Sequence, residues 1–120
     1  MAGPIPQSAE TLLTSAVTIS ANSTHTEEYD SGQCYEFELW VDMTTNGSAT
    51  EGVEIRLKRK TGSGGTKGSA PWRVKTVDVG QSNYVSYLGA VPPGTMDIEV
   101  ENKDGTYDAT LNQIYVRKAS

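Results

Sequence analysis

The sequence has 120 residues, a formal net charge of −5 and a single cysteine. This length allows one domain with a modest core, and one cysteine excludes an intrachain disulfide. The net charge argues against nucleic-acid binding, since the one basic cluster, at 56–60, alternates with apolar residues as a solvated strand face does. No apolar run approaches the roughly 18 residues of a membrane-spanning helix. We therefore expect neither nucleic-acid nor membrane partners.

The first residues, 1–11, hold two prolines, Pro4 and Pro6, and one large apolar residue, Ile5. Such a segment buries too little surface to order itself, and its prolines favour an extended path. It lacks the basic and apolar regions of a secretory signal, so we expect synthesis in a cytoplasm. The sequence predicts an extended arm over 1–11, which contacts an assembly partner, and a folded domain over 12–120.

Two strands are predicted before the centre of the chain. The stretch 12–20 (LLTSAVTIS) is rich in threonine and valine and predicts the first strand. After a turn, the stretch 24–29 (THTEEY) predicts a short, polar edge strand. This second strand contains His25, the single histidine of the chain, and Tyr29.

The stretch 34–43 (CYEFELWVDM) alternates between apolar and polar residues with a period of two. The apolar side holds Tyr35, Phe37, Leu39, Val41 and Met43. The other side holds Glu36, Glu38, Trp40 and Asp42. This alternation predicts a half-buried strand at the centre of an antiparallel sheet.

The stretch 53–60 (VEIRLKRK) alternates in the same way, but its outer face is basic. We therefore predict that it pairs with the central strand. The predicted cross-strand partners are Glu36 and Glu38 on one strand, and Arg56 and Lys58 on the other. Exposed ion pairs of this kind contribute at most about 1 kcal/mol each. We therefore expect them to determine which strand lies beside the central strand, while burial of the apolar face supplies the stability.

A glycine-rich stretch, 61–69 (TGSGGTKGS), follows the basic strand. In a phosphate-binding P-loop, the lysine precedes serine or threonine and a helix begins there. Here Lys67 precedes Gly68, and no helical pattern follows. The stretch therefore predicts a mobile hairpin tip and not a phosphate site.

Four further strands are predicted at 71–79, 84–91, 95–101 and 110–118. In the last of them Leu111 is out of phase with Ile114 and Val116, which predicts a bulge or a late strand start. No helical apolar period persists anywhere in the chain. Eight short strands separated by Gly, Pro and Asn turns predict an all-β fold, a single antiparallel β-sandwich of jelly-roll or Ig-like kind.

Residues of the types that catalyse reactions are scarce. A nucleophilic triad would have to use His25, which lies in a polar edge stretch where an exposed imidazole without a catalytic role is expected. A zinc site needs several cysteines or histidines, and the chain has one of each. The carboxylates that a glycosidase would need alternate as outward strand faces do, and the loop 102–108 lacks the donor order of a calcium loop. We expect no enzyme activity, no cofactor and no metal.

Trp40 is unusual because it lies on the polar side of its strand. An exposed tryptophan on a sheet is either covered by a loop or arm, or it anchors an interface. In a carbohydrate-binding module, such a residue would stack on a sugar ring. The predicted interface residues are Ile5, Pro6, His25, Tyr29, Trp40, Trp72 and Tyr115.

Four motifs occur together in this chain: TLLTSAVTISANST at 11–24, a polar turn with Thr and Gly after the Y-x-F-x-L-x-V strand, VPPGTMDIEV at 91–100 and IYVR at 114–117. In these motifs the chain resembles small virion proteins of tailed bacteriophages. Proteins of this family are compact β-sandwiches that decorate or cement capsids, or serve as accessory pieces of the neck and tail.

The resemblance implies a structural virion protein, above all a capsid decoration or cement protein that binds the assembled head and stabilises the joints between capsomers. Its partners would be the major capsid protein or other virion proteins, with self-association in the assembly, and its location would be the virion. An accessory protein of the tail, neck or baseplate is the alternative. A carbohydrate-binding module is the second alternative.

Overall fold

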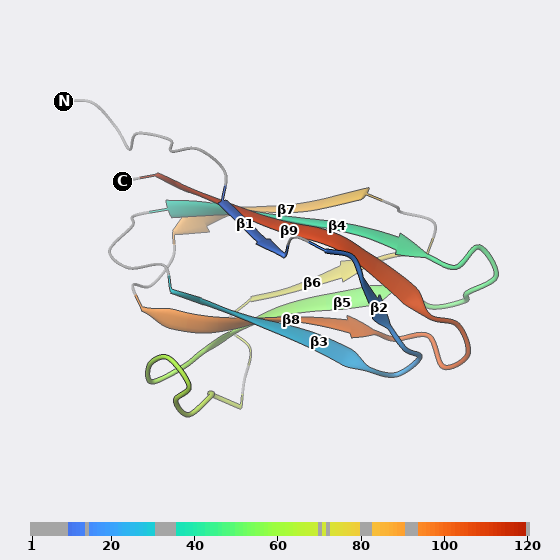
Figure 1. Ribbon diagram of the computed structural model, residues 1–120, viewed down its shortest axis with the longest axis horizontal. Helices are drawn as coiled ribbons and strands as arrows, with labels where there is room; N and C mark the ends of the chain where they lie inside the picture. The colour runs from blue at the N-terminus through green and yellow to red at the C-terminus, as the bar shows by residue number, and fades with distance from the viewer. Residues whose placement is uncertain are drawn as a thin grey trace.

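A computed structural model describes residues 10–13, 15–30, 36–69, 71, 73–79, 83–90 and 94–119. Within these residues every regular element is a β-strand, and the strands form two antiparallel sheets that face each other (Figure 1). The predicted all-β sandwich is confirmed. No helix of the described residues is long and apolar enough to span a membrane.

The five-stranded sheet consists of β1 (Glu10–Leu13), β2 (Val17–Ile19), β4 (Glu36–Thr45), β7 (Asn83–Ala90) and β9 (Ala109–Ala119). Its order is β1-β9-β4-β7, and β2 also pairs with β9. The four-stranded sheet consists of β3 (Thr24–Asp30), β5 (Val53–Arg59), β6 (Arg73–Val77) and β8 (Thr95–Asn102), in the order β3-β8-β5-β6. Most neighbouring strands are therefore distant in sequence, because the chain crosses repeatedly between the two layers.

The predicted first strand, 12–20, is interrupted in the structure. Its two parts lie in β1 and β2, which both pair with β9, and the register of β1 shifts between Thr11 and Leu13. Residues 1–9, among them Ile5 and Pro6, lie outside the described residues. The extended arm therefore stays a prediction.

The predicted pairing of the central strand with the basic strand is wrong. β4 pairs with β7 and β9, whereas β5 pairs with β6 and β8, so the two strands belong to different sheets. Arg56 lies opposite Glu99 of β8 in the register of this sheet. The physical reason is that the acidic side of β8 matches the basic face of β5 as well as β4 would, and cross-strand charges are too weak to fix a partner alone.

The core fills the space between the inner faces of the two sheets. β4, β5, β8 and β9 each contribute alternate apolar side chains that are almost fully buried. These are Leu39, Val41, Met43, Val53, Ile55, Leu57, Met96, Ile98, Val100, Leu111, Ile114 and Val116. Burying each of them contributes about 1.5–3 kcal/mol before the entropy of ordering is counted. The period-two patterns of the sequence therefore predicted the inner faces correctly.

A β-bulge in β9 confirms the predicted irregularity near Leu111. Asp42 of β4 lies opposite Gln113, while the next residue of β4 lies opposite Leu111, so Asn112 is the extra residue. The bulge reverses the phase of the strand, and both Leu111 and Ile114 point into the core.

The edge strands of the four-stranded sheet carry charged side chains in the inward-facing phase. In β3, Glu27 shares the phase of buried Tyr29. In β6, Lys75 shares the phase of buried Val77, although its own side chain is exposed at the sheet edge. Inward-pointing charges on edge strands prevent a further strand from adding to the sheet. Contacts with other molecules are therefore favoured through the sheet faces and not through these edges.

The glycine-rich stretch forms the tip of a hairpin, as predicted, and it is hydrogen-bonded along its length. Lys60 and Lys67 form a β-bridge, and the amide of Thr61 donates to the carbonyl of Thr66 at 3.0 Å. The amide of Gly68 donates to the carbonyl of Arg59 at 2.9 Å. The glycine content of the stretch predicted a mobile tip and did not predict these hydrogen bonds.

Candidate interaction face

The outer face of the five-stranded sheet carries two aromatic side chains at its centre, and we call it the aromatic face. Its residues are Glu38, Trp40 and Asp42 of β4 and Asn112, Gln113, Tyr115 and Arg117 of β9. Trp40 lies directly opposite Tyr115 in the register of the two strands. The two residues share the outer face because Leu39 and Val41, their neighbours in the alternation, are buried in the core.

Both rings make hydrogen bonds along their own strands. The Trp40 indole Nε1 donates to Glu38 Oε1, and the Tyr115 hydroxyl donates to Gln113 Oε1. Each acceptor lies two residues before its aromatic partner, so each ring leans along its strand towards that acceptor. Because β4 and β9 are antiparallel, the two rings lean in opposite directions. Together they extend over the three cross-strand pairs of this face, Glu38–Arg117, Trp40–Tyr115 and Asp42–Gln113. Both aromatic side chains are half-buried.

Polar groups surround the two rings. Arg117 Nη2 lies 3.0 Å from Glu38 Oε1 and 3.1 Å from Oε2. At the other end, Asn112 Nδ2 donates to Asp42 Oδ1 at 3.3 Å and to Thr44 Oγ1 at 3.2 Å. The face therefore combines an aromatic centre with a rim of carboxylate, amide and guanidinium groups.

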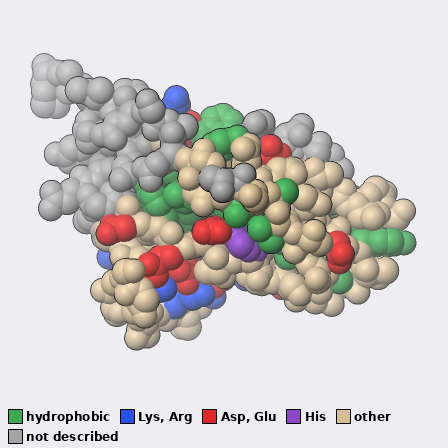
Figure 2. All heavy atoms as spheres, viewed as in Figure 1, with side chains coloured by type: hydrophobic (Ala, Val, Ile, Leu, Met, Phe, Trp, Pro, Cys, Tyr) green, Lys and Arg blue, Asp and Glu red, His purple; other side chains and the backbone are tan. Residues whose placement is uncertain are grey.

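The outer face of the four-stranded sheet carries a network of ion pairs instead, and we call it the ion-pair face. Its residues are Glu28 of β3, Glu54, Arg56 and Lys58 of β5, Asp97, Glu99 and Glu101 of β8, and Lys60 and Lys67 of the hairpin tip. Acidic and basic side chains gather side by side over one end of this sheet (Figure 2). Arg56 alone contacts Glu54 at 2.8 Å, Glu99 at 3.0 Å and Glu101 at 2.6 Å.

Glu99 is one of two enclosed carboxylates of this network, with a side chain that is 7% exposed. Burial would raise its pKa, but hydrogen bonds from Lys67, Arg56 and Lys58 lower the pKa to about 2. Lys67 reaches Glu99 at 2.6 Å and Asp97 at 3.0 Å, and these contacts raise its pKa. Glu99 and Lys67 are therefore both charged at neutral pH.

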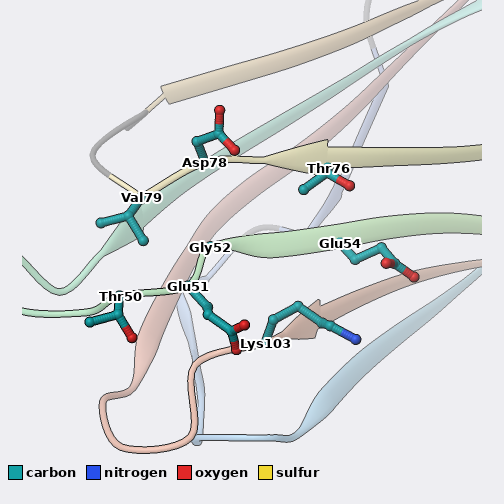
Figure 3. Close-up of a pocket in the computed structure, with 8 residues that line it drawn as sticks. All are labelled: Thr50, Glu51, Gly52, Glu54, Thr76, Asp78, Val79 and Lys103. Carbon is teal, nitrogen blue, oxygen red and sulfur yellow. The ribbon is translucent and has the colours of Figure 1, made fainter.

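An open groove of about 480 Å³ lies at the end of the same sheet (Figure 3). It is lined by Thr50, Glu51, Gly52, Glu54, Thr76, Asp78, Val79 and Lys103. Beside it, buried Asp104 accepts hydrogen bonds from the amides of Thr50 at 2.9 Å, Thr106 at 3.0 Å and Tyr107 at 2.7 Å. These amides, Tyr107 first, lower the pKa of Asp104 well below its ordinary value. Asp104 thus joins the loop between β4 and β5 to the loop between β8 and β9.

No group of three or more His, Cys, Asp or Glu among the described residues is arranged to hold a metal ion. Asp104 in the loop 102–108 makes the hydrogen bonds of a turn.

The structure brings together two of the predicted interface residues, Trp40 and Tyr115. Tyr29 is 5% exposed and belongs to the core, so its side chain is not available to a partner, and its selection as an interface residue is corrected. The reason is that the edge strand β3 turns Tyr29 towards Met96, its partner on β8. His25 is 22% exposed, and its Nε2 lies 2.8 Å from Glu27 Oε1.

Trp72 lies outside the described residues, as do Ile5 and Pro6. Sequence reasoning did not select Gln113 and Arg117, although both lie in the phase of Tyr115 beyond the bulge. The signal that could have found them is the period-two spacing 113, 115 and 117.

No protein-family model matches the chain, and no curated protein matches its sequence. Among solved structures, it is similar to the Yersinia pseudotuberculosis-derived mitogen over 97% of this chain and 86% of that chain, at 18% identity and a TM-score of 0.51. It is also similar to a carbohydrate-binding module of Cellvibrio mixtus lichenase 5A in complex with cellotriose, over 91% and 84%, at 12% identity and a TM-score of 0.51.

The SPBc2 prophage-derived protein YomS aligns over 100% of this chain and 97% of that chain, at 17% identity and a TM-score of 0.47. Further carbohydrate-binding modules are among the matching structures. At these identities the likeness to the mitogen and to the lichenase module shows the fold alone. The protein is a β-sandwich of the class that these two solved structures represent.

Proposed function

We propose that this protein is a structural protein of a phage particle, a decoration or cement protein that binds the assembled head at the joints between capsomers. The aromatic face is the observation that carries the proposal. Tryptophan, tyrosine and arginine are the residue types that concentrate at the centres of protein interfaces and contribute most of the binding energy. Trp40, Tyr115 and Arg117 lie together on this face.

The centre of the ion-pair face, around Arg56 and Glu99, is a poor docking surface by comparison. A partner that covered it would remove water from charges that already have partners inside the molecule, and such desolvation often costs more than the new contacts return. The inward-pointing charges of β3 and β6 hinder strand addition at the edges. The aromatic face is therefore the surface on which the partner docks.

The partner in this proposal is the major capsid protein or another virion protein, with copies of this chain as neighbours in the particle. A ligand that binds only the assembled shell stabilises it by mass action, and many copies multiply the effect. The predicted arm over 1–11 adds a second contact through Ile5 and Pro6. The motifs at 91–100 and 114–117, which resemble those of phage virion proteins, support the same assignment.

The test is the number of copies of this chain in purified particles, measured by quantitative mass spectrometry against the major capsid protein. A fixed fraction of the capsid lattice is the expected result. A handful of copies would move the protein to the neck, tail or baseplate and so contradict the head assignment. Complete absence from particles would overturn a structural virion role altogether.

Carbohydrate binding is the second candidate function, and the geometry of the two rings favours it. Rings that lean along a sheet, with carboxylate and amide groups around them, suit the stacking of a sugar ring and hydrogen bonds to its hydroxyls. A module of the same fold was solved with cellotriose. Affinity electrophoresis in a soluble β-glucan gel tests it: we expect retardation that Trp40→Ala abolishes and Val74→Ala preserves, and unretarded migration rejects it.

A further inference from the structure

The hairpin tip places three hydrogen-bond donors around one carboxylate that belongs to another strand. Lys60 Nζ lies 2.6 Å from Glu28 Oε2, and the backbone amide of Gly64 donates to the same oxygen at 2.9 Å. The hydroxyl of Ser63 donates to Glu28 Oε1 at 2.8 Å. An ammonium, an amide and a hydroxyl thus converge on a single anionic group.

The loop holds these donors by contacts of its own. The amide of Gly65 donates to the carbonyl of Gly62 at 2.8 Å, and Thr61 and Thr66 bridge the base of the tip. Gly64 has φ +67°, a left-handed conformation that side chains disfavour and that turns its amide towards the carboxylate. Successive amides presented by such turns form anion-binding concavities. None of these contacts within the loop requires Glu28.

Glu28 fills this concavity from an accessible position. It lies on edge strand β3 with its side chain 32% exposed. The hydrogen bond from Lys60, followed by those from Gly64 and Ser63, lowers its pKa to about 2. The bound group is therefore an anion at every physiological pH, and it is held by donors from a segment more than 30 positions away in the sequence.

Neighbouring charges leave the concavity suited to an anion. Asp97 Oδ1 lies 3.5 Å from Lys60 Nζ, which would weaken binding of a second anion. However, Lys67 Nζ lies 3.0 Å from the other oxygen of Asp97 and offsets part of its charge, although it also lies 2.6 Å from Glu99. Lys60 Nζ lies nearer to Glu28 than to Asp97, so an anion in the place of Glu28 takes the shorter of the two contacts.

We infer that the hairpin tip 60–68 is an anion-binding site that Glu28 occupies within the molecule, and that a carboxylate or phosphate group of a partner takes the same donors when Glu28 is displaced. Glu28 then acts as an internal competitor that keeps the site closed until such a group arrives. This inference is independent of the proposed capsid role, since it concerns the other sheet and another chemistry.

The experiment follows the amide of Gly64 by two-dimensional ¹H–¹⁵N NMR while sodium phosphate or sodium acetate is added at constant ionic strength. In Glu28→Ala we expect a saturable shift of this amide, with binding at least about tenfold tighter than in the wild-type protein, because the internal competitor is gone. A stronger response to phosphate or to acetate identifies which group the site prefers.

Two variants serve as controls. Glu51→Ala removes an exposed carboxylate far from the tip and should leave the wild-type response unchanged. Lys60→Met, combined with Glu28→Ala, should abolish the gain, with the dispersed amide spectrum showing that the fold persists. Absence of a saturable shift in Glu28→Ala would overturn the inference, and so would a gain that survives the loss of Lys60.

Discussion

The outer faces of the two sheets arise from the same alternation along their strands, yet they carry different chemistry. On the ion-pair face Glu99 is 7% exposed and contacts Arg56, Lys58 and Lys67. On the aromatic face the Arg117 side chain is 46% exposed, and its ion-pair partner is Glu38. One face shields its charges within the molecule, whereas the other leaves a cation at its rim and aromatic rings at its centre.

The two faces are therefore expected to serve different purposes, the ion-pair face the stability of the fold and the aromatic face the binding of a partner. Charges that are enclosed and shared among several partners are costly to disturb, because removal of one leaves the others buried without compensation. Half-exposed aromatic residues gain little further burial within the chain but gain much when a partner covers them. We therefore expect substitutions on the ion-pair face to weaken the fold and those on the aromatic face to weaken association.

The largest expected effect is that of Glu99→Ala on the free energy of unfolding. Its loss removes a carboxylate that Lys58, Arg56 and Lys67 share, although Arg56 keeps Glu54 and Glu101 and Lys67 keeps Asp97. We therefore expect destabilisation by about 3 kcal/mol, the lower end of the range for a broken buried ion pair. The matched substitution on the aromatic face is Glu38→Ala, which removes a pair with a well-exposed arginine and should cost about 1 kcal/mol or less. Urea unfolding of both variants measures the two values, and equal losses would remove the distinction between the faces.

Trp40→Ala tests the aromatic face as a binding surface. Truncation of a central interface tryptophan typically costs about 2 kcal/mol or more, so we expect particle affinity to fall by a factor of about 30. Co-sedimentation of the labelled protein with particles that lack it measures the affinity. Val74→Ala is the control, because Val74 is an exposed apolar residue, 48% accessible, on the other sheet. Equal losses in both variants would show that the aromatic face has no special part in docking.

The acid stability of the protein should follow the carboxylates of the ion-pair face. The pKa values of Glu28 and Glu99 are lowered from 4.5 to about 2 in the folded protein. A lowered pKa means that the unfolded chain binds protons more readily, so this stabilisation is present above pH 4.5 and is lost as the pH falls towards 2.

Thermal unfolding between pH 6 and 2 measures this loss. We expect the melting temperature of the wild-type protein to fall across the window, and that of Glu99→Gln to start lower and fall less. Parallel curves for the two proteins would mean that Glu99 does not contribute to the acid sensitivity.

The smallest effect concerns the hairpin tip. Gly64 has φ +67°, and an alanine there is strained by about 1 kcal/mol, although its added methyl group would meet no atom within 4 Å. Gly62 of the same tip has equally open surroundings without a left-handed φ, so Gly62→Ala should leave stability nearly unchanged. Chemical unfolding of the pair compares them, and identical stabilities would show that the tip does not hold its turn in solution.

The sequence by itself determined the apolar inner faces of the central strands. Alternation along β4, β5 and β8 predicted Leu39, Ile55 and Ile98 as core residues, because the pleat of a strand sends successive side chains to opposite faces whatever lies beside it. The phase break at Leu111 likewise predicted the bulge of β9. The alternation along β4 also placed Trp40 on the polar side of that strand.

Only the tertiary structure decided which strands meet. Many strands of this chain alternate in the same way, so the pattern cannot select β9 and β7 as the partners of β4, and the strand predicted beside it lies in the other sheet. The same choice placed Trp40 opposite Tyr115 and enclosed the outward-facing Glu99 beneath three cations from β5 and the hairpin tip. The closure of the hairpin tip on Glu28 joins residues far apart in sequence, and such contacts depend on the non-local packing of the sheets, which local periodicity does not encode.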